Sequence, residues 1–315
     1  MRIRDKVKKP QRPVVAYEIL PPREKDGTLN SYAEIISSLL SQTHIDAINI
    51  PEVRDENGRG ERPVSNHKRG KPREFGRLLQ DIVGVEAIVN RVVVHMSYDD
   101  QCRWIEETNK QYEIENMIIV GGESSSIDYP GPSVNQILKK ISSEFNSNGG
   151  DIFCGGIAIP SREKESINLI KKAEHGAEFF TTQVLYDSSK IIKMIDYYQN
   201  QCDDLGTFPR RLLLSFAPVS SQKNIDFLKW LGVEIPSETE RYLQGRPGSM
   251  TERSLDVAIE VLSDTLDYIS NNNLHVPIGL NVEHIMSYNF QSSVEMLQEL
   301  ARIYREFCIK SKQYN

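Results

Sequence analysis

The chain has 315 residues, of which 39% are hydrophobic, and this is enough to build a substantial core. A formal net charge of −6 at pH 7 argues against a general nucleic-acid-binding protein. No apolar run is long enough to cross a bilayer, and the four cysteines are scattered without a Cys-x-x-Cys pair. We therefore expect a cytoplasmic protein without a membrane segment, a disulfide framework or a zinc site.

The chain begins with a basic segment, residues 1–12, which lacks the apolar centre of a secretory signal, and we expect a disordered arm there. Short apolar runs follow it, each with the length of a buried strand. In chain order these predicted strands are 14–20, 45–50, 91–95, 117–121, 152–159, 178–185, 211–216 and 276–282. Stretches with apolar residues at helical spacing alternate with them, over 31–40, 98–112, 134–145, 163–175, 189–201, 224–231, 255–271 and 292–310.

The alternation of strand and helix predicts a parallel sheet with right-handed crossovers. Eight such units fit a (β/α)8 TIM barrel, a single α/β domain over residues 13–315 that ends in a C-terminal helix. An open, doubly wound sheet is the alternative, but its first turn usually carries Gly-x-Gly-x-x-Gly. The first turn here is Pro21-Pro22-Arg23, and no low-complexity linker marks a domain boundary.

Polar and ionisable residues collect at the C-terminal ends of the predicted strands, where barrel enzymes hold their active sites. These strand ends carry Glu18, Glu52, His95, Gly121-Gly122-Glu123, Gln183, Ser215 and Asn281-Val282-Glu283. The bodies of the strands are apolar by contrast. This segregation predicts an enzyme, and no set of His, Asp or Glu at ligand spacing indicates a metal site.

Glu18 lies at the end of the first predicted strand, shortly before the two prolines. A carboxylate is costly to place there without a functional reason. Partial burial at a barrel mouth raises the pKa of a carboxyl group, which suits a general acid. A surface glutamate beside a turn is the alternative interpretation.

Several short motifs occur in a fixed order along residues 17–286. They are Glu18 to Arg23 as Glu-x-x-Pro-Pro-Arg, His95-Met96-Ser97, Gly121-Gly122-Glu123, Gly176-Ala177, Thr182-Gln183, Pro218-Val219-Ser220, Val233-Glu234-Ile235-Pro236 and Leu280-Asn281. Each motif is short, but their order and spacing together resemble the methylenetetrahydrofolate reductase family. The chain is identified as a divergent member of that family.

The resemblance implies reduction of 5,10-methylenetetrahydrofolate, or a related pterin one-carbon carrier, to the 5-methyl form, a step that leads to methionine. In the family, NAD(P)H reduces a bound FAD, which passes hydride to the folate. By resemblance, Glu18 is the general acid, Glu123 is a catalytic residue that contacts the pterin, and Gln183 and Asn281 bind substrate. A loop or capping role for Glu123 and a buried structural amide for Gln183 are the alternatives.

The resemblance also implies contacts with FAD from His95, Gly121, Gly122, Asn168 and Lys172. Glycines admit a flat ring or a phosphate close to the backbone because no Cβ intervenes. A structural histidine and a solvated lysine are the alternatives for His95 and Lys172. The basic cluster 67–73 is interpreted either as a site for a phosphate or a polyglutamate tail or as a mobile charged loop.

Three positions depart from the family pattern. Gly121 replaces an arginine, the loop after the fifth predicted strand is short and lacks a histidine, and Val282 stands where an arginine is usual. The first two departures affect the FAD site. We therefore keep two alternatives, a flavin-free reductase that uses nicotinamide directly and a folate-binding or methyl-transferring subunit that acts with a partner. A metal-dependent aldolase barrel is a more distant alternative. The sequence does not decide whether the chain forms a homo-oligomer.

Overall fold

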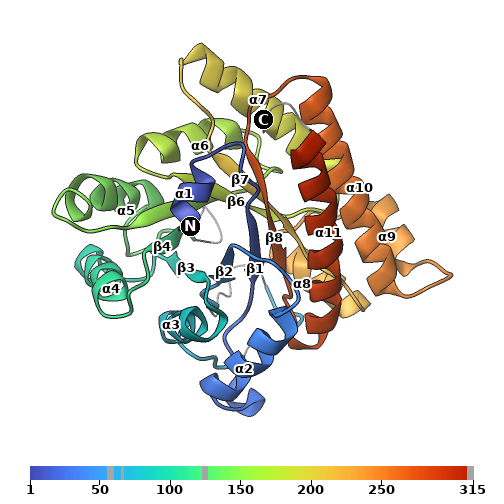
Figure 1. The fold of residues 1–315 in the computed structure, drawn as a ribbon, viewed down its shortest axis with the longest axis horizontal. Coiled ribbons are helices and arrows are strands. Elements are labelled where there is room, and N and C mark those ends of the chain that lie inside the picture. Colours follow the sequence, from blue (N-terminus) through green and yellow to red (C-terminus); the bar gives the residue numbers. More distant parts are fainter. Residues whose placement is uncertain (55–59, 65–66, 123–126, 311–315) are drawn as a thin grey trace.

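The computed structural model describes all residues except 55–59, 65–66, 123–126 and 311–315. Eight parallel strands close a barrel in sequence order, and helices surround it (Figure 1). The strands are β1 (Val15–Glu18), β2 (Ala47–Ile50), β3 (Glu86–Val92), β4 (Asn116–Val120), β5 (Phe153–Ala158), β6 (Phe179–Val184), β7 (Arg211–Phe216) and β8 (Ile278–Glu283). The predicted (β/α)8 barrel with a C-terminal helix is confirmed.

The helices that the structure describes form the outer layer of the barrel, with short 3-10 and π turns between some of them. They are α1 (Ile3–Val7), α2 (Leu29–Leu40), α3 (Pro72–Val83), α4 (Tyr98–Lys110), α5 (Val134–Lys140), α6 (Glu165–Glu174), α7 (Ser188–Asp204), α8 (Gln222–Trp230), α9 (Ser237–Gln244), α10 (Met250–Asn271) and α11 (Phe290–Lys310). None of them is both long enough and apolar enough to span a membrane.

Side chains fill the inside of the barrel, because alternate residues of each strand point inward. Ala16 and Ala47 contribute small side chains from β1 and β2, whereas β5 and β6 contribute Phe153 and Phe179. These two rings are stacked with their centroids 5.2 Å apart. Gly155 makes room for them, since a Cβ there would lie 2.6 Å from the ring of Phe179. The interior is therefore a packed core.

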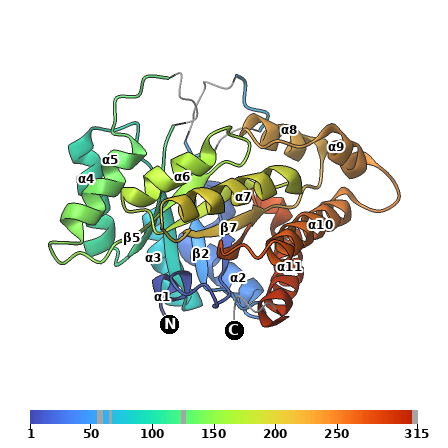
Figure 2. The ribbon, with the colours of Figure 1, turned by 90° about the horizontal axis from the view of Figure 1, so that it is seen from above.

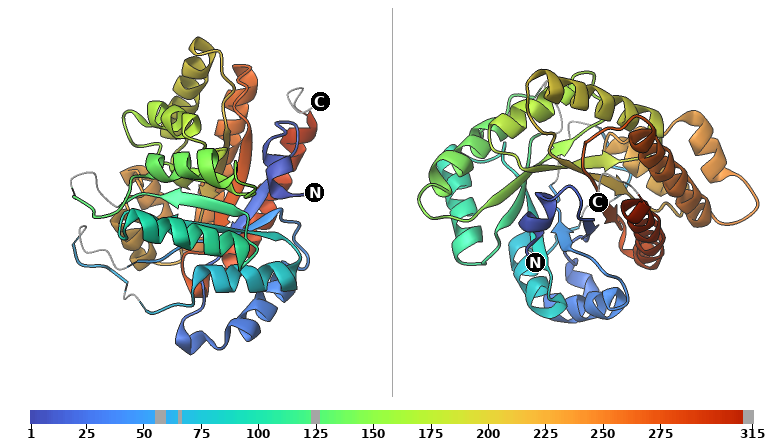
Figure 3. Two further views of the ribbon diagram at one scale, coloured as in Figure 1. Left: turned by 90° about the vertical axis from the view of Figure 1, so that its left-hand side faces the viewer. Right: turned by 45° about the horizontal axis from the view of Figure 1, so that its top comes forward.

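The expected disordered arm is wrong for residues 3–7, which form α1 and close the N-terminal end of the barrel (Figure 3). Ile3 and Val7 lie one helical turn apart and are buried against the inner core. The buried guanidinium of Arg211 on β7 donates to the carbonyl oxygens of Val7 at 3.2 Å and Lys9 at 2.7 Å. The apolar pair was missed because basic residues surround it in the sequence.

The third strand was predicted over 91–95, but β3 spans Glu86–Val92, so His95 lies three residues beyond the strand. The predicted strand began only after Asn90, which is polar and yet buried, as is Arg91. Arg91 is tolerated there because its guanidinium is paired with Glu52. Helices α3 and α9 were also missed, and α3 begins within the predicted basic cluster 67–73.

We predict that Ile3→Ala lowers the free energy of unfolding by about 2 to 4 kcal/mol, because it leaves a cavity beneath the barrel core. Ile3 is 2% exposed, whereas Ile309 near the end of α11 is 75% exposed. The matched control Ile309→Ala should therefore stay within about 0.5 kcal/mol of the wild type. Urea denaturation measures both, and equal values for the two variants would mean that α1 does not stabilise the barrel.

Candidate active site

A cavity of about 360 Å³ lies at the C-terminal ends of the strands. Figure 2 shows that the N-terminus and the C-terminal end of α11 lie on the opposite face of the barrel. Charged and polar residues on the cavity wall are Glu18, Glu52, Arg54, Arg62, Arg69, Asn90, Arg162, Gln183, Glu283 and His284. The strand-end residues predicted as functional therefore largely converge, as expected for a barrel. The described residues contain no cluster of three His, Cys, Asp or Glu that would hold a metal ion.

Glu18 and Glu283 form the acidic part of this wall. They are direct partners in the parallel pairing of β1 with β8, so both side chains point to the same face. Burial, and then the charge of Glu283, raise the pKa of Glu18 well above its usual value. Burial also raises the pKa of Glu283 to about 7, against the opposing effect of hydrogen bonds from Ser215 and Asn281. The pair therefore retains a proton near neutral pH.

Two asparagines hold the carboxyl groups in place. Asn49 Nδ2 of β2 donates to Glu18 Oε2 at 2.6 Å, and Asn281 Nδ2 donates to Glu283 Oε1 at 3.2 Å. Asn281 is fully buried, and its Nδ2 also lies 3.0 Å from Ser215 Oγ. The structure thus places Asn281 in contact with the acids, and its predicted contact with substrate stays a prediction.

Gln183 lies on the cavity wall as predicted for a substrate-binding residue. Its Nε2 donates to the carbonyl oxygen of Leu231 at 3.1 Å, and its Oε1 accepts from the amide of Val184 at 3.3 Å. These backbone contacts fix the orientation of the amide. A ligand in the cavity would therefore meet a preoriented group, and the substrate role itself stays a prediction.

The predicted cofactor residues after β3 and β4 differ in their access to the cavity. Gly121 and Gly122 line the cavity, whereas His95 is not among its described lining residues and contacts Tyr129 edge to face. A Cβ on Gly122 would lie 2.2 Å from the ring of Tyr129, so this glycine is needed to accommodate that side chain. Gly121 is more open, with Val134 at 3.4 Å from a Cβ built there. Glu123 lies outside the described residues.

Asn168 and Lys172 on α6 come together around Glu165, which is 1% exposed. Lys172 Nζ donates to Glu165 Oε1 at 3.1 Å and to the carbonyl oxygen of Ile157 at 2.5 Å. Asn168 Nδ2 donates to Glu165 Oε2 at 3.2 Å. Burial lowers the pKa of Lys172, partly offset by Glu165. Both predicted FAD ligands are therefore engaged by the same carboxylate.

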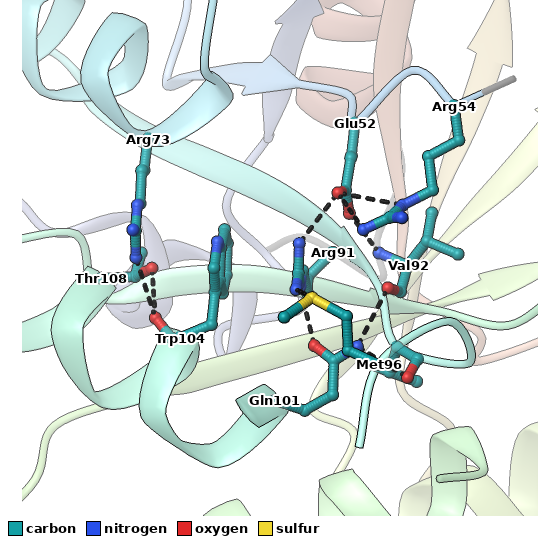
Figure 4. A network of polar contacts seen from close by, with 10 residues as sticks. Glu52, Arg54, Arg73, Arg91, Val92, Met96, Gln101, Trp104 and Thr108 are labelled. Carbon is teal, nitrogen blue, oxygen red and sulfur yellow. Dashed lines mark hydrogen bonds and ion pairs between the residues drawn. The ribbon is translucent and has the colours of Figure 1, made fainter. Parts of the chain in front are cut away.

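Figure 4 shows a network that fixes the rim after β2 and β3. Glu52 Oε1 accepts from Arg91 Nη1 and Arg54 Nη2, both at 2.8 Å, and its Oε2 accepts from the amide of Val92 at 2.8 Å. The guanidinium of Arg91 lies over the ring of Trp104, 4.4 Å from a ring centroid. This network supports Glu52 and Arg54 at the cavity. Of these residues only Glu52 was predicted as a strand-end residue, because the prediction put Arg91 at the start of a strand and Arg54 lies further along the loop after β2.

An aromatic wall on α8 was also missed. The rings of Phe227 and Trp230 are stacked 5.9 Å apart and line the cavity together with Arg62. The Arg62 guanidinium lies 5.1 and 5.2 Å from these two ring centroids, a cation–π arrangement. The spacing of the two aromatic residues on a predicted helix was the available signal. They offer a flat apolar surface to a ligand.

His284 is a further cavity residue that the sequence did not indicate. It follows β8 and is buried, and its Nδ1 lies 3.3 Å from the carbonyl oxygen of Glu18. Burial lowers the pKa of His284 to about 4, with a smaller opposing effect from this hydrogen bond. Among the described residues, Nε2 has no hydrogen-bond partner. His284 is thus a neutral imidazole beside Glu18.

This fold and this site define a barrel protein with the geometry of an enzyme, in which an acid pair lies at the carboxyl ends of the strands. Family comparison agrees, because the profile described as "Methylenetetrahydrofolate reductase" matches residues 2–295. The chain belongs to the methylenetetrahydrofolate reductase family.

Two relatives illustrate the extent of the similarity. Methylenetetrahydrofolate reductase 2 of Schizosaccharomyces pombe is 24% identical over 211 residues, which cover 61% of this chain and 32% of the relative. The chain thus spans about a third of the length of that relative. A Clostridium thermocellum protein that binds two copies of 5-methyl-5,6,7,8-tetrahydrofolic acid has the same fold. Its TM-score is 0.78 at 20% identity, and the match covers 96% of this chain and 99% of that one.

We predict that Lys172→Met lowers the free energy of unfolding by about 3 kcal/mol, because the buried carboxylate of Glu165 loses its cation. The double variant Glu165→Leu/Lys172→Met should regain most of this loss. Lys171→Met on the exposed face of α6 is the matched control and should leave stability unchanged. Urea denaturation measures the series. An unchanged free energy of unfolding in Lys172→Met would show that the ion pair with Glu165 does not hold Lys172.

We predict that His284 makes the protein sensitive to acid. Its folded-state pKa of about 4 lies below the ordinary value of 6.5, so its contribution to stability is present above pH 6.5 and is lost as the pH falls through 4. The wild type should lose about 3 kcal/mol relative to His284→Gln over this interval. Urea denaturation at a series of pH values measures the difference. The control His275→Gln, at an exposed position, should follow the wild type. Parallel curves for the wild type and His284→Gln would contradict the assignment.

Proposed function

We propose that this protein reduces 5,10-methylenetetrahydrofolate, or a related pterin one-carbon carrier, to the 5-methyl form. One observation carries the proposal: in a chain of this family, Glu18 lies in the cavity beside Glu283, and burial together with the charge of Glu283 raises its pKa well above the usual value. The 5-methyltetrahydrofolate bound by the Clostridium thermocellum protein of the same fold supports a folate ligand. The four free cysteines agree with a reducing cytoplasm.

Glu18 supplies the proton that opens the five-membered ring of the substrate. The bond between the methylene carbon and N10 breaks, its electron pair stays on N10, and N10 takes the proton of Glu18. The methylene carbon is left as an N5 iminium cation, which accepts a hydride and becomes the methyl group. Glu18, now ionised, recovers a proton from solvent for the next turnover.

The remaining wall residues have binding roles in this proposal. The aromatic faces of Phe227 and Trp230 would stack against the flat part of the folate, and Gln183 would pair with the pterin edge. The guanidinium groups of Arg54 and Arg62 would hold the carboxylates of the glutamate portion. Arg69 of the predicted basic cluster also lines the cavity, and its Nη1 donates to the carbonyl oxygen of Pro21 at 2.9 Å.

We propose NAD(P)H as the source of the hydride, with FAD as the carrier typical of the family. A flavin held here would supply hydride chemistry, as the relay between a nicotinamide and the substrate. The open backbone at Gly121 fits the approach of a flat ring, and Arg162 on the same wall fits a phosphate. Asn168 and Lys172 join this site only if Glu165 releases them.

A flavin-free reductase is the second candidate, and the contacts of Glu165 and Tyr129 favour it. Glu165 engages both helix residues assigned to FAD, and the Tyr129 ring covers Gly122. The absorption spectrum of the purified protein separates the two, since bound flavin is yellow. A third candidate, a folate-binding or methyl-transferring subunit with a partner, would bind 5-methyltetrahydrofolate without forming it from the methylene substrate.

We predict that Glu18→Gln lowers kcat by about 100-fold or more with little change in KM, because the general acid is lost while the cavity keeps its shape. The assay is anaerobic formation of 5-methyltetrahydrofolate from the methylene substrate with NADH or NADPH, with and without added FAD. Glu260→Gln, on the exposed face of α10, is the control and should keep wild-type turnover. Wild-type turnover in Glu18→Gln would remove Glu18 from the reaction. No turnover in the wild type under any of these conditions would reject the proposed function.

A further inference from the structure

Glu283 has no role in the reaction as stated so far, although it faces Glu18 across the pairing of β1 with β8. Both residues line the cavity, and the fully buried Asn281 makes hydrogen bonds to both carboxyl groups. Two buried carboxyl groups in such proximity do not ionise together, because the second negative charge would meet the first in a poorly solvated site. One of the two must hold the proton.

The surrounding donors favour the charge on Glu283. Its carboxylate receives hydrogen bonds from Asn281 Nδ2 and from the Ser215 side chain, and an anion can only accept such bonds. Neutral Glu18 instead has a hydrogen to donate. Glu18 accepts from Asn49 Nδ2 through Oε2, which leaves its other carboxyl oxygen, Oε1, to carry the proton.

We propose that Glu283 is a positioning residue: its carboxylate takes the negative charge of the pair and so keeps the transferable proton on Glu18. This inference rests on the proposed function, in which Glu18 is the general acid. When Glu18 gives its proton to N10, the pair gains a second negative charge at the moment that the iminium cation forms. The two carboxylates then stabilise this positive charge across the cavity.

The other charged and titratable groups around the pair do not replace Glu283 in this role. They are Tyr186 after β6, His284 after β8, Glu52 and Arg54 after β2, and Arg62, Arg69 and Arg162 on the cavity wall. Tyr186 and His284 are neutral near pH 7, because burial raises the pKa of the first and lowers that of the second. Glu52 is paired with Arg91, and the arginines favour ionised carboxyl groups. Glu283 is thus the anion positioned to keep Glu18 protonated.

The experiment is a pH titration of the protonated-carboxyl band by infrared difference spectroscopy on the full-length protein. We compare the wild type with Glu18→Gln, Glu283→Gln and Glu283→Asp, and with the surface control Glu260→Gln. Glu18→Gln should abolish the band above about pH 8, where Glu283, with its pKa of about 7, is ionised. Glu283→Gln should keep a band that disappears at lower pH than in the wild type, because the neighbouring charge is gone. Glu283→Asp keeps the charge and should follow the wild type, as should the control.

Three outcomes would overturn the inference. A titration midpoint in Glu283→Gln equal to the wild type would mean that the two groups are not coupled. Loss of the band above about pH 8 in Glu283→Gln, with its retention there in Glu18→Gln, would mean that Glu283 rather than Glu18 holds the proton. A titration midpoint in Glu283→Asp equal to that of Glu283→Gln would show that the shape of the Glu283 side chain, rather than its charge, sets the midpoint. Circular dichroism confirms folding, and Glu283→Asp supplies the comparison if Glu283→Gln does not fold.

Kinetics separates a failure of this inference from a failure of the proposed function. The alkaline limb of the pH profile of kcat/KM should move to lower pH in Glu283→Gln, with KM at low pH unchanged. If Glu283→Gln reduces the substrate but the alkaline limb of its pH profile does not shift, only the role of Glu283 is rejected. Absence of turnover in the wild type rejects the proposed function, and the infrared titration then still decides whether the pair is coupled.

Discussion

The pairing of β1 with β8 is the constraint on which the site depends. It closes the barrel, and its register sets Glu18 opposite Glu283 and Ala16 opposite Asn281. A slip by one residue would turn every side chain of β1 to the other face, so the acid would leave the cavity. The register is held by the packed interior and by Tyr17, whose hydroxyl group lies 2.7 Å from Ser293 Oγ of α11. The strand pairing that closes the barrel therefore also brings the two carboxyl groups together.

The charges of the cavity are distributed in a way that orients a ligand. The acids belong to adjacent strands, β1 and β8, whereas Arg54 and Arg62 follow β2 and Arg162 follows β5. A ligand with a basic ring system at one end and carboxylates at the other would find both ends complemented. The stacked aromatic side chains of α8 add an apolar surface between polar groups, which is the usual composition of a small-molecule site.

The sequence predicted the fold well because each barrel strand is a short apolar run and each covering helix has an apolar stripe. Where polar residues lie inside the barrel wall, the prediction failed: Asn90 and Arg91 displaced the predicted third strand, although the Glu52 carboxylate makes Arg91 acceptable there. Glu18 and Gln183 were found because they end strands. Phe227 and His284 were missed because only the closed barrel reveals that a helix and the segment after β8 reach the cavity.

Local sequence also could not reveal which partners satisfy a charge. Lys172 looked like a solvated or phosphate-binding lysine, but folding brings its ammonium group to Glu165 and to the end of β5. The same limit hid the Glu283 partner of Glu18, because the two residues lie near opposite ends of the chain. Positions at strand ends are thus predictable from the sequence, whereas pairings between strands are not.

Helix α1 closes the N-terminal end of the barrel, and this limits how Glu18 can regain its proton in the proposed cycle. The N-terminal end of the barrel is closed by Ile3 and Val7 and by the hydrogen bonds from Arg211 to the carbonyl oxygens of Val7 and Lys9. Among the described residues, the packed interior therefore leaves Glu18 no path to bulk water through that end. In that cycle, water would reach the acid through the same opening as the proposed folate substrate. A bound product would block this opening, so Glu18 would be reprotonated only after the product has left.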